Sequence, residues 1–244
     1  MHNVFLSELF DWKEPKTSQK VNFVNKVLER LGFGSRLSPP RFTGVMTNVE
    51  QRINMFHLVR QVLVFNVPGD LVELGCHKGQ SAVLFKKMLD HYDPRRELHV
   101  YDSFEGLPDL KPEDGDTNYE KGGMKTTKEL LRASFEENNL ELPHIHQGWF
   151  EDTLPTKLPE KIAFAHLDGD FYDSILVSLQ HVYDKLSKNG VCLIDDYADP
   201  EIYDGWNKLP GVKVACDEFL KDKPEEVSVL YAGDYAHGYF RKLS

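Results

Sequence analysis

Apolar residues fall into short runs along the middle of the chain, and each run is followed by a longer amphipathic segment. The runs predict five strands, which cover residues 71–75, 98–102, 144–148, 162–168 and 191–196. The amphipathic segments predict helices near residues 80–89, 127–137 and 174–186, with Gly190 as the cap of the last one. Alternation of strand and helix is typical of a parallel sheet with crossover helices, so the pattern predicts a doubly wound α/β fold.

Two further apolar runs close the chain. They predict strands over residues 227–231 and 238–242. The connection between them is too short for a crossover helix, so we expect an antiparallel pair at the edge of the sheet. The expected sheet is therefore mostly parallel and seven-stranded, with its last strand antiparallel.

Helical patterns precede the sheet. Apolar residues at helical spacing predict a helix over residues 20–31, and a second helix is expected to begin at Thr47, where Thr47 and Glu50 resemble a capping box. A segment rich in Gly and Pro separates the two. We therefore expect a helical extension over residues 1–45 and one α/β domain over residues 46–244.

Residues 103–126 show no apolar periodicity and are rich in Pro, Gly and acidic residues. Loops of this length inside a compact domain are usually functional. Because the segment follows directly on a strand tip, we expect it to be a lid over a binding site.

Composition and charge argue against several classes of function. The 244 residues carry a formal net charge of −10, which argues against a broad basic surface for nucleic acid or an anionic membrane. The chain has no apolar run of the roughly 20 residues that span a bilayer, and its first residues lack the pattern of a signal peptide. Cys76, Cys192 and Cys216 stand in apolar contexts without a CxxC pair, which indicates reduced core thiols and a cytoplasmic protein.

The segment VELGCHKGQSA joins the first expected strand to its helix. Gly75 and Gly79 would let the backbone approach a ligand, while the helix N-terminus, with the Ser81 hydroxyl, would offer hydrogen-bond donors to its carboxylate. The alternative is that the glycines only serve a tight strand–helix turn.

Asp102 ends the next expected strand, where nucleoside-binding folds place an acid on the ribose hydroxyls. The glycine spacing departs from the GxGxxG that holds a pyrophosphate, which favours S-adenosylmethionine over NAD. Trp149 and Phe150, at a third strand tip, are candidates to sandwich the adenine, although core packing would also account for them.

Four acids, Asp168, Asp170, Asp195 and Asp196, stand at the tips of two buried strands. Such crowding raises carboxyl pKa values unless a cation compensates it, and ligands that are all oxygen favour Mg²⁺. Helix capping and a solvated turn are the alternative, but they account for one acid rather than four. His166 is more simply a hydrogen-bonded core histidine than a ligand.

Five segments together resemble the macrocin O-methyltransferase (TylF/MycF) family; they are GDLVELGCHKGQS, VYDSFEGLP, GWFEDTLP, LDGDFYDS and IDDY. The resemblance implies a Rossmann-like class I methyltransferase that uses S-adenosylmethionine and Mg²⁺ to methylate a sugar hydroxyl of a small natural product, and that forms a homo-oligomer. It implies cofactor contacts from Met46, Thr47, Glu73, Gly75, Gly79, Asp102, Ser103, Gly148 and Trp149, beside the candidates Ser81 and Phe150. It implies metal ligands at Asp168, Asp195 and Asp196, with Asp168 also as the proton acceptor.

The chemistry required is to make an alcohol nucleophilic at neutral pH. A metal bound to the acceptor oxygens lowers the hydroxyl pKa, and a carboxylate such as Asp168 then takes the proton. Three alternatives remain open at this point: a NAD-dependent dehydrogenase, a metal-dependent hydrolase, and a non-catalytic binding module with the same fold. The acceptor is also open, since a non-sugar vicinal diol satisfies the metal argument as well as a sugar does.

Overall fold

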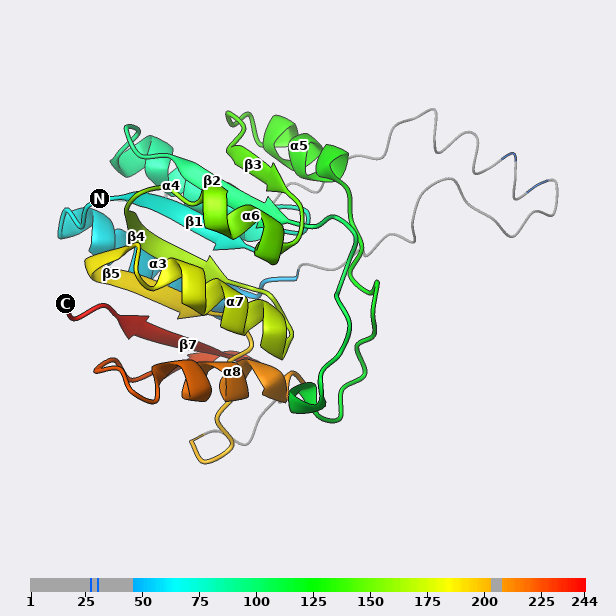
Figure 1. Ribbon diagram of the computed structural model, residues 1–244. Coiled ribbons are helices and arrows are strands. Elements are labelled where there is room, and N and C mark those ends of the chain that lie inside the picture. Colours follow the sequence, from blue (N-terminus) through cyan, green and yellow to red (C-terminus); the bar gives the residue numbers. More distant parts are fainter. Residues whose placement is uncertain (1–26, 28–29, 31–45, 203–207) are drawn as a thin grey trace.

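A seven-stranded sheet in the order β3-β2-β1-β4-β5-β7-β6 forms the centre of the computed structural model, which describes Val27, Arg30 and residues 46–202 and 208–244 (Figure 1). The strands are β1 (Asp70–Leu74), β2 (Leu98–Asp102), β3 (His144–Gln147), β4 (Ile162–Leu167), β5 (Leu186–Ile194), β6 (Ser228–Ala232) and β7 (Tyr235–Arg241). Strands β1 to β5 pair in parallel, and β7 is antiparallel to both β5 and β6. The predicted mixed sheet is confirmed.

Helices cover both faces of the sheet (Figure 1). They are α3 (Val49–Val64), α4 (Gln80–Tyr92), α5 (Lys128–Glu137), α6 (Phe150–Lys157), α7 (Tyr172–Val182) and α8 (Pro210–Leu220). Buried residues of α3, α4 and α5 share one core cluster with Leu71, whereas those of α6, α7 and α8 share the other cluster with Val72. Successive strand residues point to opposite faces, so a strand covered on both sides must be apolar throughout.

The order of the strands brings several strand tips to one place. Leu74, Leu167 and Ile194, the last residues of β1, β4 and β5, are neighbours in register. The chain winds outward from β1 to β3 and then returns to β4, so the crevice between β1 and β4 is the point where strand order reverses. Ligands of doubly wound sheets bind outside the carboxyl ends of the strands at this point.

The first described helix starts one residue later than predicted. Asn48, not Thr47, is the N-cap: its side chain accepts a hydrogen bond from the Gln51 amide, and the Gln51 side chain accepts one from the Asn48 amide. The Thr47 hydroxyl instead lies 3.5 Å from Oε1 of Gln80. The capping box is therefore real, but shifted by one position.

Helix α7 ends before the predicted position, and β5 already begins at Leu186. Gly190 is not a helix cap but lies inside β5, where the pairing with β4 shifts in register. A Cβ added at Gly190 would come within 2.7 Å of the Ser187 carbonyl oxygen, so the irregular strand requires a glycine there. Helices α6 and α8 were not predicted, and the expected helix over residues 20–31 lies outside the described residues except for Val27 and Arg30.

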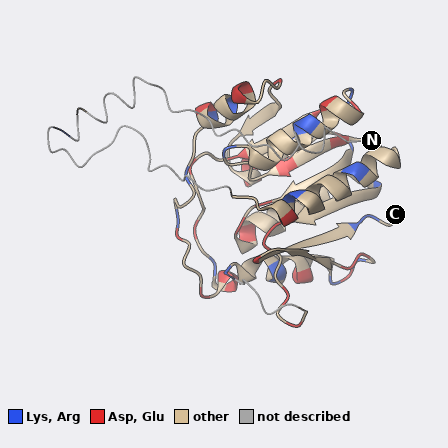
Figure 2. Ribbon diagram, turned by 180° about the vertical axis from the view of Figure 1, so that it is seen from behind, with Lys and Arg blue, Asp and Glu red and all other residues tan. Residues whose placement is uncertain are grey.

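The three cysteines are free and buried, as predicted. Seen from behind, Lys or Arg residues and Asp or Glu residues are intermingled along the helices of the described part of the chain (Figure 2). Within the described ranges, the search for a helix of membrane-spanning length and hydropathy found none.

Candidate active site

A cavity of about 510 Å³ opens at the carboxyl edge of the sheet. Its walls come from the tips of β1 to β5, from the loop over residues 103–126, from the segment before α3 and from Tyr235 of β7. Its volume is in the range of small-molecule sites. The predicted site residues that line it are Met46, Thr47, Gly75, Asp102, Ser103, Gly148, Trp149, Phe150, Asp168, Asp195 and Asp196.

Asp102 is fixed at one end of the cavity by the backbone. Its Oδ2 accepts a hydrogen bond from the His77 amide at 2.8 Å, and its Oδ1 accepts one from the Phe104 amide at 2.7 Å. Burial raises the pKa of Asp102, although the two amides act in the opposite direction. Each oxygen keeps a lone pair, so the carboxylate is held in one orientation and remains able to accept hydrogen bonds from a diol.

Met46 and Thr47 reach the cavity because Gln80 holds them. Oε1 of Gln80, the first residue of α4, accepts hydrogen bonds from the Met46 amide at 2.8 Å and from the Thr47 amide at 3.2 Å. This contact joins the segment before α3 to the start of α4. Two distant parts of the sequence therefore form the same wall.

Gly75 permits a close approach, but to protein rather than to open space. It has φ +92°, and a Cβ added to it would lie 1.8 Å from the Asp168 carbonyl oxygen. The tips of β1 and β4 touch here, so the glycine allows the Asp168 backbone to sit beside the first strand. Gly75 thus positions an acid in addition to lining the cavity.

Three residues predicted to contact the cofactor lie behind the cavity and are not part of its lining among the described residues. Glu73 is fully buried, with Oε1 2.9 Å from Nδ1 of the equally buried His166. Gly79 caps α4, and a Cβ there would come within 2.5 Å of Leu131. Ser81 is buried in α4. The expectation that His166 is a hydrogen-bonded core histidine agrees with its contact with Glu73.

The four acids of the β4 and β5 tips converge around Asp168. Asp168 shares one group of ligand atoms with His166 and Asp195, and a second group with Asp170 and Asp196. Within each group, the ligand atoms lie within 4.8 Å of one another. Asp170 and Asp196 both have positive φ, 60° and 55°, a conformation that non-glycine residues keep where the surroundings impose it.

Crowding and burial change the titration of these carboxyl groups. Burial, and then the charges of the other acids with Asp195 foremost, raises the pKa of Asp168 well above its usual value. The same two causes raise the pKa of Asp196 well above its usual value, and they raise that of Asp170 from 3.8 to about 7. The protein alone therefore holds protons in this cluster, which a bound cation would displace.

Asp195 differs because it has a basic partner. Its Oδ1 lies 2.6 Å from Nε2 of the fully buried His237 and accepts a hydrogen bond from Nε2 of Gln51 at 3.3 Å. Burial alone would raise its pKa, but the charge and hydrogen bonding of His237 outweigh it, so the pKa of Asp195 is lowered. The carboxylate stays ionised and oriented.

The donor set fits a hard divalent cation. Asp168, Asp170, Asp195 and Asp196 offer only carboxylate oxygens, and burial together with mutual repulsion raises the pKa values of three of them. Mg²⁺ prefers oxygen ligands and offsets such repulsion. Asp168, Asp170 and Asp196 are the residues that would hold it, whereas Asp195, the third ligand predicted from the sequence, is grouped with Asp168 and His166.

Several residues of the site were not singled out from the sequence; they are Gln51, His77, Tyr119, Tyr235 and His237. Asp170 was recognised as one of the four strand-tip acids but was not among the expected metal ligands. Asp170 had a signal, because it is the second acid of the DGD segment. The others come from α3, the β1–α4 turn, the lid and β7, and no local pattern in the sequence connects them with the acids.

The loop over residues 103–126 follows the cavity edge from β2 to α5, and its short 3-10 helix η1 (Pro112–Asp114) lies beside the N-terminal ends of α7 and α8 (Figure 1). Asp114 is buried; its Oδ1 accepts a hydrogen bond from the Tyr172 amide at 2.7 Å, and its Oδ2 accepts one from the Lys111 amide at 2.8 Å. Lys111 also pairs with Asp173 at 2.9 Å. The expected lid is thus an ordered strap, fixed at its middle.

Sequence comparison shows that this chain is similar to known methyltransferases. A model of the macrocin-O-methyltransferase (TylF) family matches residues 7–223. A tetracenomycin-C rhamnosyl 4'-O-methyltransferase of Streptomyces olivaceus is 34% identical over 168 residues, which are 65% of this chain and 64% of that protein. The demethyldecarbamoylnovobiocin O-methyltransferase of Streptomyces niveus is 35% identical over 74% of this chain and 69% of its own length. The mycinamicin III 3''-O-methyltransferase of Micromonospora griseorubida is 33% identical over 66% and 68%.

Comparison with solved structures likewise finds O-methyltransferases. The O-methyltransferase NovP matches with a TM-score of 0.67 and 25% identity, over 99% of this chain and 96% of that one. The calicheamicin methyltransferase CalS11 matches at 0.66 and 21%, over 95% and 97%. The O-methyltransferase TomG of Streptomyces achromogenes, solved in complex with S-adenosylmethionine, matches at 0.56 and 13%, over 99% and 96%. The last two likenesses concern the fold alone.

Proposed function

Because this chain belongs to the macrocin-O-methyltransferase (TylF) family, we propose that it transfers the methyl group of S-adenosylmethionine to a hydroxyl group, in a reaction that requires Mg²⁺. The relative from Streptomyces olivaceus is named for methyl transfer to a tetracenomycin that carries a rhamnosyl group. We therefore propose a sugar hydroxyl of a small glycosylated natural product as the acceptor. The observation that carries the proposal is the convergence of four acids around Asp168 in the same cavity as Asp102.

The two ends of the cavity have separate roles in this proposal. Asp102, held by two backbone amides, accepts hydrogen bonds from the ribose hydroxyls of the cofactor. Trp149 and Phe150, at the start of α6, flank the same region and offer aromatic surface for the adenine. When bound, the cofactor supplies an electrophilic methyl group, and Mg²⁺ would make the acceptor hydroxyl more acidic.

A carboxylate of the acid cluster removes the proton of the acceptor. Asp168 is the expected acceptor of that proton, and Asp170 is a second candidate because it lines the cavity and is equally buried. Asp195, kept ionised by His237, stays available as a ligand. The strap over residues 103–126 forms one wall of the cavity and excludes water from it.

The proposal is tested by incubating the purified full chain with methyl-labelled S-adenosylmethionine, Mg²⁺ and glycosylated natural products, and by following the label by mass spectrometry. Label should enter the sugar, and removal of divalent cations by a chelator should abolish the transfer. Unchanged turnover after complete metal removal would contradict the metal requirement. Stabilisation by NAD, without stabilisation by S-adenosylhomocysteine, would contradict the cofactor assignment.

Two variants separate the metal ligand from the proton acceptor. Asp168 is proposed both as a metal ligand and as the proton acceptor, so Asp168→Asn should lose Mg²⁺ affinity and, even at saturating Mg²⁺, should lack roughly 10²–10⁴ in turnover. The variant of a residue that is a ligand alone should recover its turnover once Mg²⁺ is saturating. Asp168→Asn and Asp170→Asn are therefore compared by Mg²⁺ titration and by turnover at saturating Mg²⁺. If Asp168→Asn keeps full turnover, Asp168 is not the acceptor.

We further propose that the protein works in the cytoplasm as a homo-oligomer, with residues 1–45 as a helical extension that helps to shape the acceptor pocket. Three free buried cysteines are in keeping with a reducing compartment. Light scattering of the full chain tests self-association, and a single-chain mass would contradict it.

A further inference from the structure

A second cluster of metal-ligating side chains lies at the opposite edge of the sheet from the acid cluster. His99 is the second residue of β2, His144 is the first residue of β3, and Glu97 immediately precedes β2. His99 and His144 are directly paired in the parallel register of the two strands, so their side chains leave the same face. The cluster is thus formed by the amino ends of the strands, whereas the candidate active site is formed by their carboxyl ends.

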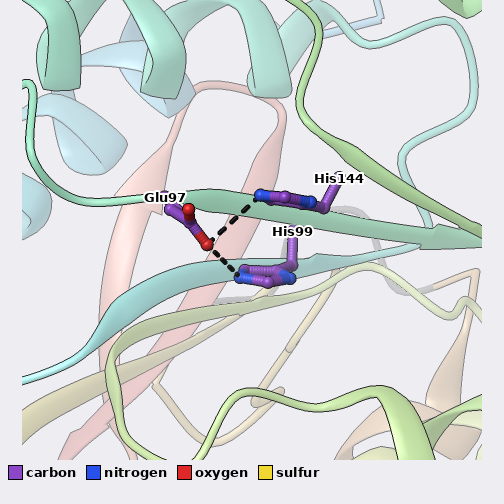
Figure 3. A group of neighbouring side chains, drawn as sticks. All are labelled: Glu97, His99 and His144. Carbon is purple, nitrogen blue, oxygen red and sulfur yellow. Dashed lines mark ion pairs between the residues drawn. The ribbon is translucent and has the colours of Figure 1, made fainter.

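The imidazole nitrogens face one carboxylate oxygen (Figure 3). Nε2 of His144 lies 3.2 Å from Oε2 of Glu97, and Nε2 of His99 lies 3.7 Å from the same oxygen. All three ligand atoms are within 4.8 Å of one another. Zinc bound tetrahedrally at about 2.0–2.1 Å from N and O ligands separates them by about 3.3 Å. The rings of His99 and His144 are stacked, with centroids 4.7 Å apart and an interplanar angle of 19°, so the two rings must turn toward one another for both nitrogens to reach one ion.

A fourth oxygen lies beside the three. Asp70, at the start of β1, accepts a hydrogen bond from the Glu97 amide through Oδ1 at 3.0 Å. Its other oxygen, Oδ2, lies 4.0 Å from Nε2 of His99. The hydrogen bond fixes the carboxylate and the backbone of Glu97 together, so the two acids approach His99 as a unit.

His99 is already arranged as a ligand. Its Nδ1 lies 3.2 Å from Nε2 of His146, whereas its own Nε2 is buried and has no hydrogen-bond partner among the described residues. With the proton on Nδ1 directed to His146, the lone pair of Nε2 faces Glu97 and Asp70. Metal-bound histidines are oriented in this way by a partner of the second nitrogen.

We propose that Glu97, His99 and His144, completed by Asp70, bind a transition-metal ion of the Zn²⁺ class. Two imidazole nitrogens distinguish this donor set from the all-carboxylate cluster around Asp168, because nitrogen ligands favour Zn²⁺ over Mg²⁺. The ion would join the amino ends of β1, β2 and β3, and β3 is the edge strand of the sheet. It would therefore stabilise the edge strand without taking part in methyl transfer.

The test uses the full chain, stripped of metal and then saturated with Mg²⁺, and titrated with Zn²⁺ against a chromophoric chelator. The variants are His144→Gln and Glu97→Gln; both side chains are more than half exposed, so neither change disturbs the core. His57→Gln, at an exposed position on α3, is the matched control. The unmodified chain and the control should bind one more Zn²⁺ per chain than the two variants, or bind it about tenfold or more tightly.

Substitution of Co²⁺ provides a readout that the acid cluster does not give. Nitrogen ligation in a near-tetrahedral site produces strong visible absorption, and this absorption should be present in the unmodified chain and lost in His144→Gln. Circular dichroism and the melting temperature of the metal-free variants report their folding. Equal Zn²⁺ stoichiometry and affinity in all four proteins, or no binding at micromolar Zn²⁺, would overturn the proposal and leave only an ion pair between Glu97 and His144.

Discussion

At the scale of single residues, Gly75 shows how one missing side chain positions Asp168, the proposed proton acceptor. An added Cβ would lie 1.8 Å from the Asp168 carbonyl oxygen, a distance that backbone must move to relieve. We predict that Gly75→Ala lowers the free energy of unfolding by about 2 kcal/mol or more, since both the positive φ and the overpacking oppose it. Gly122→Ala is the control: φ is +76° there, but an added Cβ meets nothing within 4 Å. Chemical denaturation of both variants checks this, and equal losses would mean that φ alone sets the cost.

Local patterns in the sequence predict which residues belong to the candidate site better than they predict which residues contact one another there. Gly75, Asp102 and the acids of the strand tips were all expected from local patterns. What Gly75 approaches, and whether Glu73 faces a ligand or His166, depends on which strand lies beside β1, and no local pattern specifies that. His237 illustrates the same limit, because its role arises only when β7 inserts next to β5.

At the scale of elements, Asp114 fixes the strap over residues 103–126. Its carboxylate accepts hydrogen bonds from two backbone amides, those of Tyr172 and Lys111. We predict that Asp114→Ala loosens the strap, because the buried Tyr172 amide loses its partner at a cost of about 1–3 kcal/mol and the Lys111 amide loses its partner as well. Limited proteolysis should cut faster within residues 103–126. Asp109→Ala, which removes an exposed acid of the same loop, should leave the rate unchanged, and equal protection of the two variants would contradict the prediction.

Strongly periodic elements are predictable, and irregular ones are not. The five parallel strands and the starts of α4 and α5 follow from apolar runs and caps. The end of α7 was wrong because the amphipathic pattern continues into the first residues of β5, where a bulge changes the strand register. Helix α6 has only eight residues and contains Pro155, so its sequence does not show a helical stripe. The strap was recognised by its length and composition, but its anchor at Asp114 depends on tertiary contact.

At the scale of the whole molecule, the order of the strands brings the carboxyl groups of the candidate site close together. The return of the chain from β3 to β4 places two acid-tipped strands side by side next to β1. Without a bound cation, separating these charges would make the folded state more stable. Strand order therefore concentrates negative charge at the switch point, and partial burial of the carboxyl groups strengthens their mutual repulsion.

This arrangement predicts how stability depends on pH and on Mg²⁺. The pKa of Asp170 is raised from 3.8 to about 7, so the folded metal-free protein binds a proton that the unfolded chain releases near pH 4. The resulting stabilisation is complete below about pH 4 and is lost as the pH rises through 7. Asp168 and Asp196, whose pKa values are also raised, act in the same direction. Mg²⁺ replaces these protons, so the increase in melting temperature on adding Mg²⁺ to chelator-treated protein should be small at pH 5 and larger at pH 8. Asp170→Asn removes one of the repelling charges and should reduce the pH dependence of the stability of the metal-free protein. A Mg²⁺-induced increase in melting temperature that is the same at pH 5 and pH 8 would show that no proton is displaced from the cluster.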